Sequence, residues 1–181
     1  LYPLPMPWGE DEFEVYPNRD SLPFIEQYQM DDGLQIKQFV RGTLRYKGWK
    51  NAWGDIFSEV DTLDASIAEA RLKEISDDLW DRYSYKDGEV DRVILTVELK
   101  VENDTEVVWH KQYLMDTLGN DNGSAMAQLV SCSVALAVEA VLGNEISSGV
   151  TAAPHQSKLV TRWLDQAEDI SDHFVLIDHL N

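Results

Sequence analysis

The sequence is poor in cysteine and in positive charge. A single cysteine among 181 residues excludes an internal disulfide and any metal site built from several cysteines. Fifteen lysines and arginines stand against 33 aspartates and glutamates, so the formal charge of −18 argues against nucleic acid and anionic membranes as partners. No positively charged leader precedes an apolar run, so we expect no signal peptide and a cytoplasmic setting.

The usual short motifs of catalysis and cofactor binding are missing as well. The sequence has no Gly-x-Gly-x-x-Gly turn and no Walker loop, which are the common glycine-rich phosphate cradles. It also has no Gly-x-Ser-x-Gly nucleophile elbow and no paired-histidine metal motif. We therefore predict no catalytic, cofactor-binding or metal-binding residue in this chain, and expect another domain to supply any cofactor.

Apolar residues are frequent enough for a folded core. They make up 44% of the chain and include six tryptophans, which excludes general disorder. The first residues are rich in proline and then acidic, so residues 1–14 are predicted to be an extended linker that follows a preceding domain. Residues 15–181 are predicted to form one folded domain, because this length can bury a sizeable core.

The spacing of the apolar residues predicts both strands and helices. Alternation predicts strands over 34–46, 92–101, 105–115 and 173–180, the middle two as a hairpin. Spacings of three and four predict helices over 21–28, 48–60, 64–83, 124–142 and 156–168. Helix 124–142 is apolar nearly all round, but Gln128 and Glu139 favour a helix buried in a soluble core over a membrane span. The predicted fold class is α+β, with one mixed, largely antiparallel sheet and helices packed mainly on one face.

One segment reverses the acidic balance of the chain. Residues 15–50 hold six of the fifteen basic residues against four acids. If 34–46 is a strand, Arg41, Thr43 and Arg45 lie on one face, while Gly42 leaves the opposite face open to close packing. Arginine presents a planar fork of donors that matches a carboxylate or phosphate, so this face is predicted to bind a small anion. The alternative is a solvated strand face with two ordinary arginines.

A polar turn precedes the same segment. Asn18, Asp20 and Ser21 are turn or cap formers before a short helix with Pro23 in its first turn, and the N–H groups of such a helix can bind an anion. The alternative is simple capping, with Asp20 offsetting the helix dipole. Capping does not explain Arg19, because a cation is unfavourable beside a helix N-terminus unless an anion or acid accompanies it.

Three motifs give the sequence a family resemblance. They are the stretch Tyr16-Pro17-Asn18-Arg19-Asp20-Ser21-Leu22-Pro23, the stretch Arg41-Gly42-Thr43-Leu44-Arg45-Tyr46-x-Gly48-Trp49, and the glycine-rich loop 119–123 followed by Ser124-Ala125-Met126-Ala127. Together they resemble the C-terminal domain of saccharopine dehydrogenases (saccharopine reductases), and the similarity runs from about Phe13 to the last residue. Ser124 departs from the pattern, in which threonine is expected.

The resemblance implies a fold and a place in a larger enzyme. It implies a substrate-binding and dimerisation domain, with a mixed sheet similar to that of the C-terminal domain of glyceraldehyde-3-phosphate dehydrogenase. An N-terminal Rossmann domain, absent from this chain, would bind NAD or NADP. The chain alone is then expected to be inactive, and a homodimer is the expected assembly.

The resemblance also implies a reaction. The family interconverts saccharopine with glutamate and aminoadipate semialdehyde by hydride transfer in lysine metabolism. The three carboxylates of saccharopine suit the three arginines of the segment. The substrate-contacting set carried over by the resemblance is Asn18, Arg19, Asp20, Ser21, Arg41, Thr43, Arg45 and Tyr46. Two alternatives stay open: an enzyme related to carboxynorspermidine dehydrogenase, which handles a more cationic substrate, and a non-catalytic dimerisation or binding module.

Overall fold

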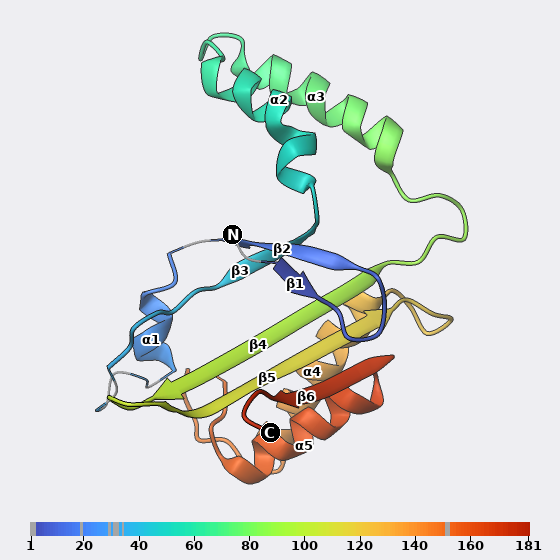
Figure 1. Cartoon of the computed structure of the whole chain (residues 1–181). Helices are drawn as coiled ribbons and strands as arrows, with labels where there is room; N and C mark the ends of the chain where they lie inside the picture. Colours follow the sequence, from blue (N-terminus) through green and yellow to red (C-terminus); the bar gives the residue numbers. More distant parts are fainter. Residues whose placement is uncertain (1–2, 19, 29, 31–32, 34, 151–152) are drawn as a thin grey trace. The chain divides into compact units, whose positions relative to one another are not determined.

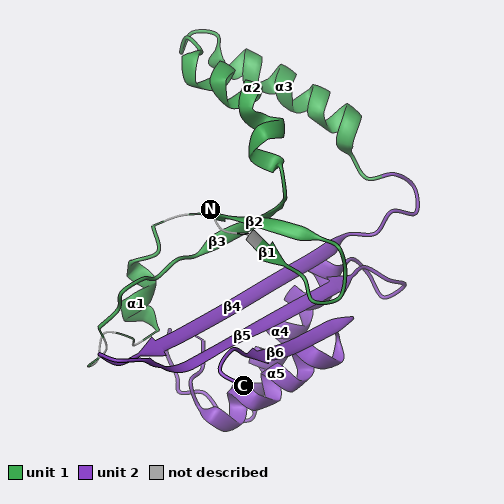
Figure 2. Ribbon diagram, viewed as in Figure 1, with its two compact units in different colours: residues 1–85 green, residues 86–181 purple. Residues whose placement is uncertain are grey.

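The chain folds into two compact units. The computed structural model describes residues 3–18, 20–28, 30, 33, 35–150 and 153–181. Unit 1 comprises residues 1–85 and unit 2 comprises residues 86–181 (Figure 2). Each unit contains its own three-stranded antiparallel sheet.

In unit 1 the sheet has the order β1-β2-β3, where β1 is Pro3–Pro5, β2 is Glu12–Pro17 and β3 is Gly42–Tyr46 (Figure 1). Leu4, Phe13 and Val15 are buried in it. The linker predicted for residues 1–14 therefore contributes paired strands, and its boundary falls inside β2. The acidic residues of this segment concealed the alternation of buried Phe13 and Val15, which marks a half-buried strand.

The strand predicted over 34–46 is shorter in the structure. Only Gly42–Tyr46 forms a strand, residues 35–41 lie outside any strand, and Leu34 lies outside the described residues. The backbone of Arg41 bonds to the polar turn instead of to a neighbouring strand. Its carbonyl accepts from the Asn18 N–H at 3.0 Å, and its N–H donates to the Ser21 hydroxyl at 2.9 Å.

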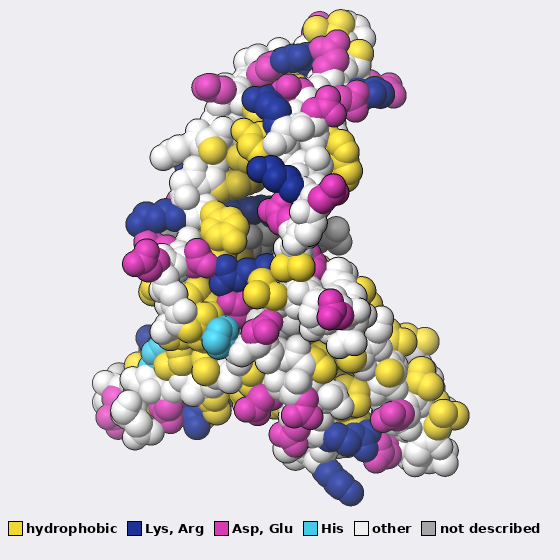
Figure 3. All heavy atoms as spheres, turned by 90° about the vertical axis from the view of Figure 1, so that its right-hand side faces the viewer, with side chains coloured by type: hydrophobic (Ala, Val, Ile, Leu, Met, Phe, Trp, Pro, Cys, Tyr) yellow, Lys and Arg dark blue, Asp and Glu magenta, His cyan; other side chains and the backbone are white. Residues whose placement is uncertain are grey.

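Three helices complete unit 1, and two of them form a helical hairpin. Helix α1 is only Pro23–Gln27, whereas α2 spans Trp49–Thr62 and α3 spans Ala68–Tyr83, as the sequence predicted. Trp49, Trp53 and Phe57 pack against one another with ring centroids 5.4 to 6.0 Å apart. Charged side chains of both signs are interspersed over the hairpin surface (Figure 3), where Arg71 pairs with Glu59.

Unit 2 places two helices on one face of its sheet. The sheet has the order β4-β5-β6, formed by Arg92–Glu102, Val107–Leu118 and His173–Asp178. Helices α4, Ala125–Leu142, and α5, Ser157–Asp169, lie behind these strands in Figure 1. The core between the layers includes buried Leu114, Ala125, Ala140 and Leu159. The predicted hairpin, terminal strand and one-sided helix layer are confirmed within this unit.

Two features of the predicted fold need correction. The α+β class holds, but the described strands form two separate antiparallel sheets instead of one mixed sheet. The helical hairpin α2–α3 intervenes between β3 and β4, so these strands belong to different units. Helix α4 is not buried all round: it is long and apolar enough to cross a membrane, yet it covers a sheet with one side and leaves a stripe exposed.

Candidate anion-binding site

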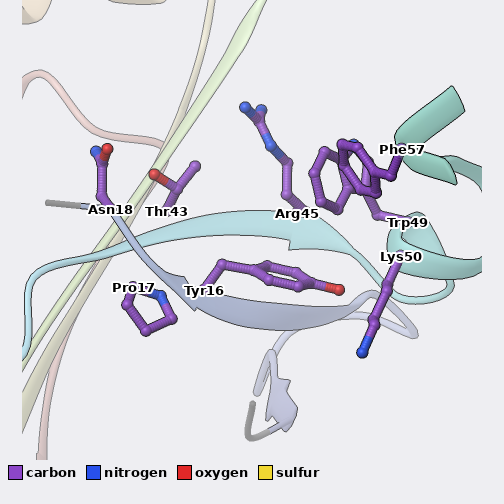
Figure 4. Close-up of a pocket in the computed structure, with 8 residues that line it drawn as sticks. All are labelled: Tyr16, Pro17, Asn18, Thr43, Arg45, Trp49, Lys50 and Phe57. Carbon is purple, nitrogen blue, oxygen red and sulfur yellow. The ribbon is translucent and has the colours of Figure 1, made fainter. Parts of the chain in front are cut away.

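An open cavity of about 550 Å³ lies in unit 1 between the β2–β3 ribbon and the start of α2. This volume is within the range of small-molecule sites, which is roughly 300–1,000 Å³. Its walls combine cationic, hydrogen-bonding and aromatic side chains (Figure 4): Tyr16, Pro17, Asn18, Thr43, Arg45, Trp49, Lys50 and Phe57.

The strand register brings the polar side chains to one face. Tyr16 stands opposite Thr43 in the antiparallel pair, so their side chains share a face. Asn18 follows Tyr16 by two residues and Arg45 follows Thr43 by two, which extends the same face in both directions. In Figure 4 the side chains of Asn18, Thr43 and Arg45 project to the same side of the ribbon, while the Lys50 side chain points the other way.

Arg45 is the main positive charge on this face. Its guanidinium carbon lies 5.5 Å from the centre of the Trp49 ring, and among the described residues it makes no ion pair. Lys50 likewise makes no ion pair with a described residue. The neighbouring Lys47 differs, because its ammonium is 2.6 Å from a carboxylate oxygen of Glu12. The cavity therefore offers a guanidinium whose donors are available to an anion.

Glu14 connects Tyr16, which lines the cavity, to Gly48 at the start of α2. Its carboxylate accepts hydrogen bonds from the Tyr16 hydroxyl and, at 3.0 Å, from the Gly48 N–H. The Tyr16 bond, followed by the Gly48 bond, lowers the pKa of Glu14 below its usual value, so the group stays ionised. Desolvation, reinforced by Glu14, raises the pKa of Tyr16. Tyr16 is therefore a protonated wall of the cavity at neutral pH and does not act as a base there.

The structure brings together three of the eight residues carried over by the resemblance. Asn18, Thr43 and Arg45 line the cavity, and Arg19 lies outside the described residues. The strand phase is the signal that grouped Thr43 with Arg45, whereas Asn18 came from the polar turn and the resemblance.

The other predicted site residues make contacts away from the cavity. Asp20 accepts from the Leu22 N–H at 3.1 Å, Ser21 bonds the Arg41 backbone, and Arg41 stacks 3.9 Å above the Phe24 ring. Tyr46 packs on Phe13 with ring centroids 5.0 Å apart. Since α1 has only five residues, the structure does not support the predicted helix-terminus anion site. A role for these four residues in substrate binding stays a prediction.

Sequence reasoning missed the aromatic part of the site. Tyr16, Trp49 and Phe57 line the cavity, although the spacing of Trp49, Trp53 and Phe57 had suggested a helix core. The alternation of Tyr16 with Asn18 was the signal for the first of them. Trp49 could not be placed from the pattern, because Gly48 turns the chain with a φ of 88° at the start of α2.

Comparison with known proteins identifies the family. An α+β chain with an arginine-containing cavity fits the class of ligand-binding domains. The sequence matches the family described as the saccharopine dehydrogenase C-terminal domain over residues 2–171. The chain belongs to this family, as the three motifs predicted, and the family is one of oxidoreductases.

One curated relative extends this result. A saccharopine dehydrogenase [NADP(+), L-glutamate-forming] from Pyricularia oryzae is 26% identical over an alignment 214 positions long, which covers 81% of this chain and 47% of the relative. The chain thus spans about half the length of the curated relative that it matches. No solved structure matches the chain.

Proposed function

We propose that this chain is the substrate-binding part of a dehydrogenase that interconverts saccharopine with glutamate and aminoadipate semialdehyde in lysine metabolism. The family and the curated relative support the oxidoreductase class, and the cavity supports the substrate. The observation that carries the proposal is Arg45, which faces the cavity beside two neutral hydrogen-bonding side chains and makes no ion pair with a described residue.

In this proposal the chain binds and orients its substrate. The Arg45 guanidinium takes one carboxylate, the Asn18 amide and Thr43 hydroxyl complete its hydrogen bonds, and Trp49 and Tyr16 pack on the aliphatic carbons. Lys50 also lines the cavity, but its side chain points to the other side of the ribbon (Figure 4), so Arg45 supplies the charge. Fixing the substrate relative to a reaction partner can contribute about 7–11 kcal/mol in the best cases, which is enough to matter without any catalytic group in the chain.

The nicotinamide cofactor belongs to a different domain in the proposal. The Pyricularia oryzae relative is named for NADP(+), which supports NADP over NAD. The residues of this chain do not fit a dinucleotide, because the sequence contains no Gly-x-Gly-x-x-Gly turn. A fold like that of the C-terminal domain of glyceraldehyde-3-phosphate dehydrogenase and a cytoplasmic setting are part of the same proposal.

Assembly as a homodimer completes the proposal and rests on helix α4. Residues four apart, and finally three apart, form a stripe in which each side chain is 52 to 60% exposed: Met126, Val130, Val134, Val138 and Val141. An uncharged stripe of this length exposes apolar area that a second copy would remove from water.

Titration calorimetry of saccharopine into the chain tests the substrate proposal. Arg45→Ala is expected to weaken binding about 10- to 100-fold, because a hydrogen bond to a charged group is worth roughly 1.5–3 kcal/mol. The matched control is Arg82→Ala, which removes the same charge from the exposed face of α3, where Arg82 pairs with Asp78.

Either of two results would contradict the proposal. One is equal binding of saccharopine by the wild type and Arg45→Ala. The other is tighter binding of carboxynorspermidine than of saccharopine, which would indicate the polyamine-related reaction. Lysine and glutamate serve as ligand controls, since each carries only part of the substrate.

A further inference from the structure

Three side chains with metal-binding atoms meet on the sheet of unit 2. Glu98 of β4, His110 of β5 and His179, which follows β6, bring their ligand atoms within 4.8 Å of one another. Glu98 and His110 lie on neighbouring strands, and the backbone N–H of His179, just after β6, donates to the His110 carbonyl at 3.0 Å. The backbone of the sheet therefore holds the three residues together. They are far apart in the sequence, so no short motif would reveal the cluster.

The hydrogen bonds of the cluster already resemble those of a ligand set. His110 Nε2 lies 2.7 Å from Glu98 Oε1, and the two imidazole rings stack with centroids 4.2 Å apart. His179 Nε2 lies 3.1 Å from Oε1 of Gln112, a side chain that is only 6% exposed. Because the Gln112 amide nitrogen donates to the Thr96 hydroxyl, Oε1 is the acceptor and His179 Nε2 carries the proton.

This arrangement leaves the His179 Nδ1 lone pair free for a metal ion. A histidine ligand usually donates its other ring N–H to a carbonyl or carboxylate, and that partner fixes the tautomer and the ring orientation. Gln112 is in that position for His179. The buried amide is therefore a positioning residue, and its contact is the observation that separates this cluster from a surface ion pair.

We propose that Glu98, His110 and His179 form a site for a divalent transition-metal ion, for which zinc is the natural probe. Two imidazoles and one carboxylate, with water as a fourth ligand, suit zinc, copper or nickel, whereas calcium and magnesium prefer oxygen ligands alone. The ion would replace the proton between His110 and Glu98. It would tie the turn after β6 to β4 and β5, and none of its ligands lines the anion-binding cavity.

Zinc binding requires the side chains to adjust, because the stacked rings of His110 and His179 must turn until both lone pairs point to one ion. Ligands about 2.0–2.1 Å from a tetrahedral zinc ion lie about 3.3 Å apart, so the 2.7 Å contact must open and the longest separation must close. Glu98 is free to rotate, since its side chain is 42% exposed. The nearby lysines are offset by acids: Lys100 lies 3.4 Å from Glu102, and Lys111 lies 3.5 Å from Asp178.

Zinc titration of the 181-residue chain against a competing chelator tests the site. One tightly bound zinc per chain is expected, with a rise in Tm. The double variant His110→Gln, His179→Gln is expected to lose at least about 100-fold in affinity, because even outer-shell partners are worth about 10- to 100-fold. His155→Gln is the matched control, since His155 is an exposed histidine outside the cluster. Magnesium at the same concentration is expected to cause no shift.

The proposal is overturned if the double variant binds zinc as tightly as the wild type, or if His155→Gln loses as much zinc affinity as the double variant. Circular dichroism of the metal-free variants checks that they fold. If the double variant does not fold, Glu98→Gln, which preserves shape, is measured instead, with at least a 10-fold loss expected and no loss taken as refutation. Saccharopine is absent throughout, so the outcome is separate from that of the substrate proposal.

Discussion

An alanine at Gly42 would disturb the ribbon that carries the anion-binding cavity. Its Cβ would lie 2.7 Å from Cγ1 of Val15 and 3.1 Å from the carbonyl oxygen of Tyr16. The first distance is shorter than real Cβ contacts. The second distance is also tight, and it involves a backbone atom, which cannot move as a side chain can. Val15 is buried and β-branched, so it has no alternative rotamer that avoids the contact at low cost. Gly42→Ala must therefore push β2 away from β3.

The expected magnitude follows from overpacking. Forcing an extra methyl group into a packed contact costs about 1–3 kcal/mol, and we expect the free energy of unfolding to fall by this amount. Gly54→Ala is the matched control, because Gly54 lies inside α2 and an added Cβ would meet nothing within 4 Å. There, alanine is expected to stabilise the chain by about 0.5–1 kcal/mol through helix propensity.

Urea unfolding followed by tryptophan fluorescence measures both variants. Trp49 and Trp53 lie in unit 1 with both glycines, so the fluorescence signal includes this unit. The urea midpoints of the wild type and the variants are compared with the same m-value, the slope of the unfolding free energy against urea concentration. A Gly42→Ala midpoint equal to or above the wild type, with Gly54→Ala behaving as expected, would show that β2 and β3 have room at Gly42. The account of the close ribbon would then be wrong.

Three further predictions concern unit 2. The Asp91 carboxylate accepts from the N–H groups of Met126 and Ala125, which lowers its pKa, so its stabilisation of α4 is present above about pH 4 and is lost as pH falls further. Asp91→Asn should thus lower the Tm at pH 7, and its difference from the wild type should shrink as pH falls below about 4. Asp116→Ala should lower the free energy of urea unfolding by roughly 3–5 kcal/mol, since Asp116 is 4% exposed and the variant loses a largely buried charge pair whose atoms lie 2.6 Å apart in Asp116 and Arg92; a loss under 1 kcal/mol would contradict this. The double variant Val134→Glu, Val138→Glu places two charges in the exposed stripe of α4, so it should sediment as a monomer without loss of helix content. A variant that still sediments as a dimer would show that the stripe is not the dimer interface.

The parts of the fold that were predictable are those with a local signal. The hairpin β4–β5 alternates from Val93 to Val101, and its strands formed as expected apart from their ends. The length of β3 had no such signal, because the backbone of Arg41 forms its hydrogen bonds with Asn18 and Ser21 and not with a neighbouring strand. Nor does the sequence show that α4 covers a sheet with one side only, since valine suits an exposed stripe as well as a buried one.

In the candidate site, too, features with a local sequence signal were predictable and those that depend on tertiary contacts were not. Period-two alternation predicted that Thr43 and Arg45 share a face, which the register of β2 and β3 confirms. The helix periodicity of Trp49 and Phe57 was also correct, but it does not say what the helix faces. The direction of α2 depends on Gly48, and the apolar wall of the cavity therefore came from structure alone.

The charge at Arg45, and not the net charge of the chain, determines whether this acidic chain can bind a carboxylate. The formal charge of −18 repels an anion at long range, but at physiological ionic strength this repulsion is screened over about 8 Å. A bidentate contact with the Arg45 guanidinium acts at hydrogen-bond distance, which is well inside this screening length, so salt screens it less than the long-range repulsion. Arg45→Ala and Arg82→Ala change the net charge equally, and only the first alters the cavity. If Arg45→Ala weakens saccharopine binding more than Arg82→Ala does, the difference measures the contribution of the Arg45 contact. If both variants weaken binding equally, binding depends on the net charge of the chain and the Arg45 contact contributes nothing.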